Sequence, residues 1–171
     1  MNYFELFKIP VQLKVDKNEI RKKFFELSRE SHPDYFVNNT NGEQQNALES
    51  SALLNKAFKT FSNGDETIKY VLEQKGLIET DEKYGLPPSF LMEMMELNEE
   101  LAEAQPGDGD TSAKLATQIK QLQNELYEPV AGIIENYEEG VTTEKELLQV
   151  KEYYFKKKYL LRLQHQLNQK L

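Results

Sequence analysis

The sequence contains no cysteine and only two histidines among its 171 residues. The absence of cysteine excludes disulfides, thiol nucleophiles and thiolate ligation of zinc or iron–sulfur clusters. It is compatible with a reducing cytoplasm, which is where we expect the protein to work. A glycine-rich phosphate loop is missing as well. We therefore expect that the chain does not hydrolyse ATP itself.

Long apolar runs are also absent. No stretch of about 18 apolar residues occurs, so no segment is expected to span a membrane. The first ten residues, MNYFELFKIP, show no charged region followed by a long apolar stretch, and we expect no signal peptide. Apolar residues nevertheless make up 39% of the chain and charged residues 29%. This balance allows a buried core beneath a soluble surface.

Acidic side chains exceed basic ones, and the excess is unevenly placed. Residues 1–75 hold 11 Lys and Arg against 11 Asp and Glu, so the remainder carries the whole net charge of −8. An acidic half would repel phosphates, which argues against nucleic acid as a partner. It suits a protein that presents a basic or mixed surface. The change in charge along the chain also suggests two modules.

The spacing of apolar residues predicts helices almost throughout and no strands. In the first module we expect helices over about 3–7, 16–31, 43–61 and 66–76. Asp16 followed by Glu19 has the spacing of a capping box and should begin the second of these helices. Pro33 prevents that helix from continuing, because proline disfavours helical geometry in the residue before it.

Residues 76–88 look like a linker, and residues 89–171 are predicted to form a second module. Its three helices are expected over about 90–104, 112–138 and 143–169. Ser89 should cap the first, and Pro129 should kink the second because proline removes an internal hydrogen bond. Short connections favour an antiparallel three-helix bundle. The predicted fold class is therefore all-α, with a helical module over 1–75 followed by a three-helix bundle.

The stretch RESHPDYF places His32, Pro33 and Asp34 directly after a basic helix. A His–Asp pair can orient a general base, but a two-residue separation across a rigid proline makes it hard for the carboxylate to reach the imidazole while both address a substrate. A zinc site needs three convergent ligands, and His165 is the one other histidine. A helix-terminating turn would explain Pro33 alone. We expect no enzyme, no metal and no cofactor, and a hydrolase using this pair is kept as an alternative.

The segment FLMEMMELNEELAE at 90–103 has two apolar faces when it is advanced about 100° per residue. The residues of an ordinary core stripe cluster within about 60°, namely Phe90, Met94, Leu97 and Leu101. Leu91, Met92 and Met95 fall outside this stripe, among glutamates. An exposed apolar patch with an acidic rim is typical of a protein-binding site, and methionine adapts well to a partner. The pattern leaves a second interpretation open, in which a neighbouring helix covers these three side chains.

The sequence IRKKFFELSRESHPDYF, followed by LNKAFKTF, resembles the J-domain of DnaJ-type co-chaperones. The resemblance implies that His32, Pro33 and Asp34 stimulate ATP hydrolysis by a DnaK-like chaperone. It also implies that a charged face of the preceding helix docks on the same partner. The best candidates for that face are Arg21, Lys22 and Arg29.

The sequence departs from the general J-domain pattern at three positions. Phe25 and Glu26 stand where general J-domains tend to carry basic residues, and Tyr35 replaces the usual Lys or Arg after the triplet. These differences favour a dedicated ATPase chaperone over a generalist one.

The opening NYFELFKIP, the segment at 90–103 and the length of the chain are similar to the HscB family, J-domain co-chaperones of iron–sulfur cluster assembly. This resemblance covers essentially the whole chain. It implies two partners, an HscA-type ATPase chaperone and the scaffold protein IscU, and no nucleic acid or membrane. The residues that it assigns to scaffold binding are Leu91, Met92, Met95, Glu96, Glu99, Glu103 and, by its place in the family alignment, Phe155. A J-domain co-chaperone for a different client is the alternative.

Overall fold

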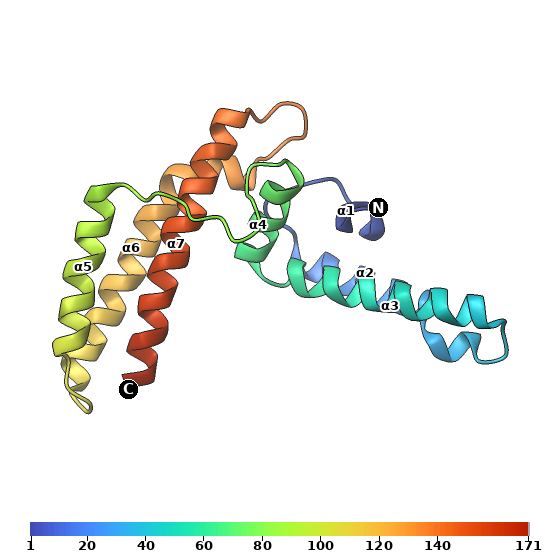
Figure 1. Cartoon of the computed structure of the whole chain (residues 1–171), viewed down its shortest axis with the longest axis horizontal. Coiled ribbons are helices and arrows are strands. Elements are labelled where there is room, and N and C mark those ends of the chain that lie inside the picture. Colours follow the sequence, from blue (N-terminus) through green and yellow to red (C-terminus); the bar gives the residue numbers. More distant parts are fainter. Residues whose placement is uncertain (171) are drawn as a thin grey trace. The chain divides into compact units, whose positions relative to one another are not determined.

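The computed structural model describes residues 1–170, and every regular element within that range is a helix (Figure 1). The all-α class expected from the sequence is therefore confirmed. The elements are α1 (Tyr3–Phe7), α2 (Lys17–Ser31), the 3-10 helix η1 (Pro33–Phe36), α3 (Asn41–Phe61), α4 (Gly64–Gln74), α5 (Pro88–Glu103), α6 (Gly109–Glu135) and α7 (Glu144–Lys170).

The chain divides into two compact units. Unit 1 comprises Met1–Lys75 together with Tyr137–Val141, the short connection after α6. Unit 2 comprises Gly76–Asn136 and the residues from Thr142 onward. The segment at 76–88, which the sequence suggested as a linker, thus clusters with unit 2.

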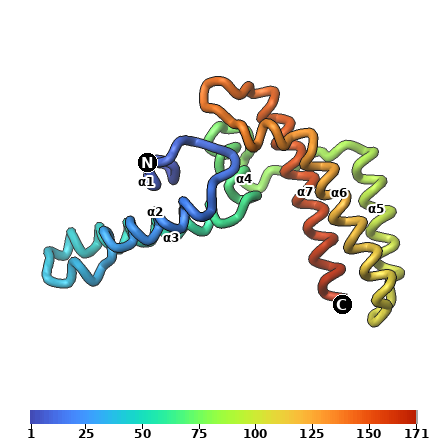
Figure 2. The backbone as a smooth tube through the Cα atoms, turned by 180° about the vertical axis from the view of Figure 1, so that it is seen from behind, coloured from blue at the N-terminus to red at the C-terminus, as the bar shows by residue number. Residues whose placement is uncertain are grey.

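Unit 1 is built on a hairpin of α2 and α3, which lie side by side in Figures 1 and 2. The ring of Phe24 stacks on that of Phe58 with centroids 4.1 Å apart, so an aromatic contact ties the two helices together. At the base of the hairpin the rings of Phe4 and Phe7 pack on Phe61, at 5.0 Å and 5.2 Å. Such ring pairs add to the stability gained from burial. These ring contacts fix α2 and α3 relative to each other, and so position the segment that joins them.

The N-terminus of α2 forms as the sequence predicts, with one difference. The side chain of Asp16 accepts hydrogen bonds from the backbone N–H groups of Asn18 (2.9 Å) and Glu19 (3.3 Å). Glu19 does not reach back to complete the capping box. Its carboxylate instead pairs with Lys23 one turn further on, at 3.3 Å. An i,i+4 pair of this orientation supports the helix in its own right.

Unit 2 is a bundle of α5, α6 and α7 around one core. The buried side chains of this core are Phe90, Met94, Leu97, Leu101, Ala104, Leu115, Ile119, Leu160, Leu163 and Leu167. The last helix begins with a capping box, because Thr143 accepts from the N–H of Glu146 (3.1 Å) and the Glu146 carboxylate accepts from the N–H of Thr143 (3.0 Å). A cap at 142 or 143 was expected from the sequence.

The starts of two helices in unit 2 differ from the expected ones. Helix α5 starts at Pro88, so Ser89 lies inside its first turn and does not cap it. Proline suits this position because the first turn leaves its backbone nitrogens without partners in any case. Helix α6 begins earlier than expected, at Gly109, because Asp108 accepts from the N–H (3.2 Å) and the hydroxyl (2.7 Å) of Thr111.

The segment before α5 is fastened to α7. Lys151 donates to the Glu82 carboxylate at 2.8 Å, and both side chains are largely shielded from solvent. The hydrogen bond from Lys151 holds the pKa of Glu82 below its ordinary value. Two residues further on, Tyr84 stacks on Phe155 with centroids 4.7 Å apart and planes 3° from parallel. One ion pair and one ring stack thus hold this segment on the bundle.

We expect the Glu82–Lys151 pair to stabilise the protein in a pH-dependent way. In a double-mutant cycle with Glu82→Gln and Lys151→Met, the coupling energy at pH 7 should be about 0.5–1 kcal/mol, the upper part of the range for partly exposed pairs. Because the folded pKa of Glu82 is depressed, this contribution is complete above the ordinary value of 4.5 and is lost as the pH falls through the folded pKa. Urea unfolding from pH 7 downward measures it. A coupling energy that does not change with pH would contradict the assignment.

Candidate functional site

The His-Pro-Asp turn forms the tip of the α2–α3 hairpin. Helix α2 ends at Ser31, His32 adopts extended backbone angles (φ −64°, ψ 130°), and Pro33 opens η1. The backbone N–H of Asp34 donates to Nδ1 of His32 at 3.2 Å, and the N–H of Tyr35 donates to the His32 carbonyl at 3.1 Å. These local bonds fix the turn. The Asp34 side chain is 85% exposed, so its carboxylate is presented to solvent.

The Asp34 carboxylate lies nearer to the His32 imidazole than the intervening Pro33 led us to expect. Oδ2 of Asp34 lies 3.4 Å from Nδ1 of His32, because η1 turns the Asp34 side chain back toward the preceding ring. Separation is therefore no argument against a catalytic pair. Nδ1 of His32 already accepts from the backbone N–H of Asp34, however, so the carboxylate does not orient the imidazole as a general base requires. Within residues 1–170 no group of three potential ligands could hold a metal ion.

The basic face of α2 contains Arg21, Lys22 and Arg29, and all three side chains are exposed. At about 100° per residue they fall within one third of the helix circumference. The neighbouring Lys23 differs from these three cations because it makes contacts within the protein. Its Nζ pairs with Glu19 and donates to the carbonyl of Lys8 at 3.2 Å. The three residues that the resemblance implicates are thus accessible from one side of the hairpin.

Helix α5 carries the apolar face with an acidic rim that was expected from the sequence of unit 2. Its core stripe is buried, with Met94 fully enclosed, whereas the next methionine, Met95, is 60% exposed. Leu91 and Met92 are exposed as well, and so are the carboxylates of the rim, Glu96, Glu99 and Glu103. No helix within residues 1–170 covers these apolar side chains. Of the two interpretations left open by the pattern, burial under a neighbouring helix is wrong.

Phe155 is set differently from the α5 residues. It is only partly exposed, and its ring contacts those of Tyr84 (4.7 Å, stacked) and Tyr154 (5.2 Å, edge-on). The next residue, Lys156, places its Nζ 5.6 Å from the centre of the Phe90 ring. This turn of α7 therefore lies beside the first turn of α5. Sequence reasoning gave Tyr84 no part in the site, since a ring stack between residues 71 positions apart leaves no local pattern.

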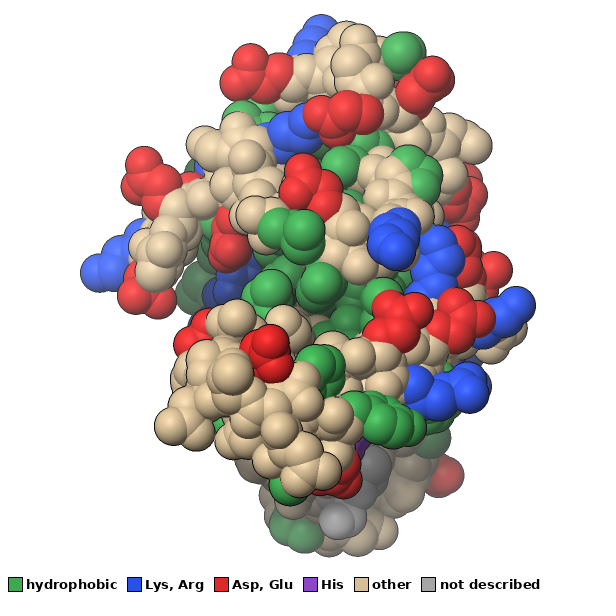
Figure 3. All heavy atoms as spheres, turned by 90° about the vertical axis from the view of Figure 1, so that its right-hand side faces the viewer, with side chains coloured by type: hydrophobic (Ala, Val, Ile, Leu, Met, Phe, Trp, Pro, Cys, Tyr) green, Lys and Arg blue, Asp and Glu red, His purple; other side chains and the backbone are tan. Residues whose placement is uncertain are grey.

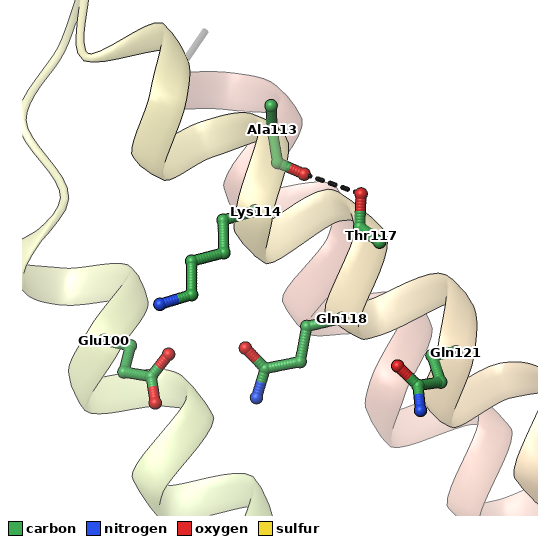
Figure 4. Close-up of a pocket in the computed structure, with 6 residues that line it drawn as sticks. All are labelled: Glu100, Ala113, Lys114, Thr117, Gln118 and Gln121. Atoms are coloured by element: carbon green, nitrogen blue, oxygen red, sulfur yellow. Dashed lines mark hydrogen bonds between the residues drawn. The ribbon is translucent and has the colours of Figure 1, made fainter.

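A hollow of about 660 Å³, lined mainly by polar side chains, lies between α5 and α6, and no local sequence pattern predicts it. Figure 4 shows Lys114 and Gln118 of α6 reaching toward Glu100 of α5, with the Thr117 hydroxyl donating to the Ala113 carbonyl (3.0 Å). The lining offers amide, hydroxyl and charged groups of both signs. It contains no aromatic or large aliphatic side chain, and such anchors dominate protein interfaces.

The surface in Figure 3 shows Lys and Arg side chains interspersed with Asp and Glu, and hydrophobic side chains set among them. The face drawn carries no large area of a single charge, which is the footprint that nucleic acid binding requires. A membrane-spanning helix would need a longer apolar run than any helix within residues 1–170 provides.

The helical hairpin of unit 1 carries an exposed His-Pro-Asp tip, and a helical bundle follows it. These features indicate a J-domain co-chaperone. Comparison with known proteins places the chain more closely. The family model described as "HSCB C-terminal oligomerisation domain" matches residues 86–168. A co-chaperone protein HscB homolog of Psychromonas ingrahamii is 30% identical over 168 residues, which cover 91% of this chain and 99% of that protein. A homolog of Vibrio vulnificus is 37% identical over 117 residues, 68% of each chain.

Solved structures agree with the sequence comparisons. The crystal structure of human co-chaperone protein HscB superposes with a TM-score of 0.84 at 26% identity, covering 99% of this chain and 82% of that one. Chaperone HscB from Vibrio cholerae gives 0.78 at 27% identity, with 99% and 96% covered. The chain belongs to the HscB co-chaperone family, as its sequence led us to expect.

Adjacent methionines on α5 should differ sharply in their contribution to stability. Met94→Ala removes a fully buried side chain and should cost about 2–5 kcal/mol in free energy of unfolding. Met95→Ala trims an exposed side chain and should change that free energy by less than about 0.5 kcal/mol. Urea unfolding followed by circular dichroism measures both. A large cost at Met95 would mean that its face is structural and not free to bind a partner.

Proposed function

We propose that this HscB-family chain stimulates the ATPase of an HscA-type chaperone and delivers an IscU-type iron–sulfur scaffold to it. The observation that carries the proposal is that one chain exposes two unlike surfaces. One is the His-Pro-Asp tip with its basic helix, and the other is an apolar α5 face rimmed by carboxylates. Exposed apolar side chains on a helix whose other face fills a core are what a binding surface requires.

In the chaperone-binding arm the three triplet residues have separate roles. Pro33 fixes the turn, so that little order has to be gained on binding. His32 holds the backbone of Asp34 through its Nδ1 atom, and Asp34 offers its carboxylate to the partner. The cations on α2, Arg21, Lys22 and Arg29, would attract an acidic surface and speed encounter more than they add to affinity.

In the client-binding arm, Leu91, Met92 and Met95 would supply apolar contact, and methionine can adapt its shape to the scaffold. The carboxylates of Glu96, Glu99 and Glu103 would select a client with a basic or mixed rim. Phe155, held between two tyrosine rings, would offer a ring edge that is already ordered.

Joining both arms in one chain brings the client to the ATPase at a high effective concentration. Hydrolysis then locks the chaperone onto the client, which favours release of the cluster and its transfer to acceptor proteins. The chain itself contributes binding surfaces and no covalent chemistry, so it acts as a co-chaperone and not as an enzyme. We place this role in the cytoplasm.

Asp34→Asn should abolish stimulation of the chaperone ATPase while leaving scaffold binding unchanged. The change removes one charge from an exposed side chain and keeps its shape, so the fold should be unaffected. Steady-state phosphate release by the chaperone, with and without scaffold, measures the first effect, and calorimetry the second. Glu49→Gln, which neutralises an exposed carboxylate of α3 and keeps the oxygen that accepts from Gln45, is the matched control and should stimulate normally. Loss of both activities together in Asp34→Asn would contradict the separation of the two arms.

Alanine at Leu91, Met92 and Phe155 should weaken scaffold binding at least tenfold, because truncating central apolar contacts typically costs more than about 1 kcal/mol each. Calorimetric titration of the scaffold measures the loss. The control replaces Leu148 and Leu161, two exposed leucines of α7, with alanine and should bind as the wild type does.

Phe155 also stacks on Tyr84, so the pair Leu91→Ala and Met92→Ala is tested without it. If that pair binds the scaffold with unchanged affinity, the client-binding face has been misplaced. If the wild type itself does not bind, the chain is a J-domain co-chaperone for another client.

A further inference from the structure

Beside the His-Pro-Asp turn the hairpin carries a hollow of about 370 Å³, lined by Phe25, Ser28, Arg29, His32 and Tyr35. Four of these residues come from α2 and its cap, at positions separated by three, four and seven residues. That spacing puts their side chains on one face of the helix. Tyr35 reaches the same place from η1, where its ring stands edge-on to that of His32 at 6.4 Å.

The two aromatic walls of this hollow are unusually exposed for such large rings. Phe25 is 57% exposed and Tyr35 is 67% exposed. Neither ring is needed for the core of unit 1, since the neighbouring Phe24 already provides the stack on Phe58. Apolar surface that stays exposed beside charged groups marks interaction sites, and aromatic side chains dominate the energetics of interfaces.

We propose that this aromatic hollow receives one apolar side chain of the HscA-type ATPase chaperone, with a carboxylate next to it that pairs with Arg29. Phe25 and Tyr35 would then determine which chaperone the protein activates. This inference rests on the proposed function and adds to it the chemistry of the contact.

The surroundings of the hollow identify the occupant. Arg29 and His32 belong both to its lining and to the surface proposed for the chaperone, so a partner docked on the triplet lies directly over the hollow. Of the five lining residues Arg29 carries the one permanent charge, which calls for a carboxylate opposite it. A second copy of the chain fits poorly, because a two-fold contact would bring the same face, and hence Arg29, against itself.

The size of the hollow limits what it can take. Ligand pockets begin at about 300 Å³, so this one lies near the lower end of the range. It suits a single large side chain better than a helix or a strand. Because Phe25 and Tyr35 stand where general J-domains tend to carry cations, a chaperone surface built to meet those cations would find two rings in their place. The hollow would therefore also disfavour binding of a general chaperone whose surface is built to meet those cations.

The test is a titration of the HscA-type chaperone ATPase with Phe25→Lys and Tyr35→Lys variants at low and high salt. Each variant should raise the concentration for half-maximal stimulation about tenfold, the loss typical of an interface anchor. Maximal stimulation should stay at the wild-type level because the triplet is intact. The loss should persist at high salt, which screens charges but does not weaken apolar contact. Phe25→Leu and Tyr35→Phe, which keep apolar volume, should stay close to wild type.

Leu48→Lys is the matched control, since it places the same charge at an exposed apolar site on α3 outside the hollow and should behave as wild type. Circular dichroism confirms that each variant is folded. Unchanged half-maximal concentrations for the two lysine variants, with Asp34→Asn still inactive, would overturn the hollow and leave the proposed function standing. Failure of the wild type to stimulate at all would overturn both. A change in self-association without a change in stimulation would assign the hollow to a second copy and also overturn the proposal.

Discussion

Pro33 cannot continue the helix that precedes it, and the surface proposed to bind the chaperone follows from that constraint. Helix α2 has to stop at Ser31, and the chain then turns through η1 before α3 runs back along α2. The turn also supplies its own hydrogen-bond partners, so that the backbone N–H of Asp34 is satisfied by His32. Without the proline, the helix could continue through this segment, and its backbone N–H and C=O groups would pair within the helix. With it, a carboxylate and an imidazole stand at an exposed, ordered tip.

The apolar face of α5 has a different origin. The bundle covers only part of the circumference of this helix, whereas apolar side chains extend beyond the covered part. Helix α5 packs one stripe into the core of unit 2, and the remaining circumference stays in water. Met94 and Met95 are neighbours in sequence and identical in chemistry, yet one is enclosed and the other exposed. Position on the helix decides between them. Apolar side chains on the solvent-exposed face add little to folding, and we propose that a partner covers them.

Most features governed by local rules could be predicted from the sequence, although the starts of α5 and α6 were misplaced by a few residues. Features governed by tertiary contact could not be predicted. The cap at Asp16, the end of α2 and the two faces of α5 follow from backbone chemistry and helical period. The side chain of Glu19 was misassigned, since the nearby Lys23 competes for it.

Contacts across long stretches of chain left no signal in a single sequence. The stack of Tyr84 on Phe155 and the hollow between α5 and α6 are of this kind. Even the short His32–Asp34 contact was missed, because it depends on η1 folding Asp34 back toward the ring. The meeting of Phe25 and Tyr35 in one hollow depends on the same turn.

Opposite charge on the two surfaces gives the chain a way to keep its partners apart. Under the proposed function, a client with a basic rim would be attracted by Glu96 and Glu99 and repelled by Arg21 and Arg29. An acidic chaperone surface would be attracted by the two arginines and repelled by the two glutamates. Each partner would thus be selected by attraction at one site and by like-charge repulsion at the other, and specificity of this kind needs no tight binding at either. Because electrostatic attraction alone would accept many acidic proteins, a shaped apolar contact beside the basic face adds the discrimination that charge lacks. The aromatic hollow is placed where such a contact would act.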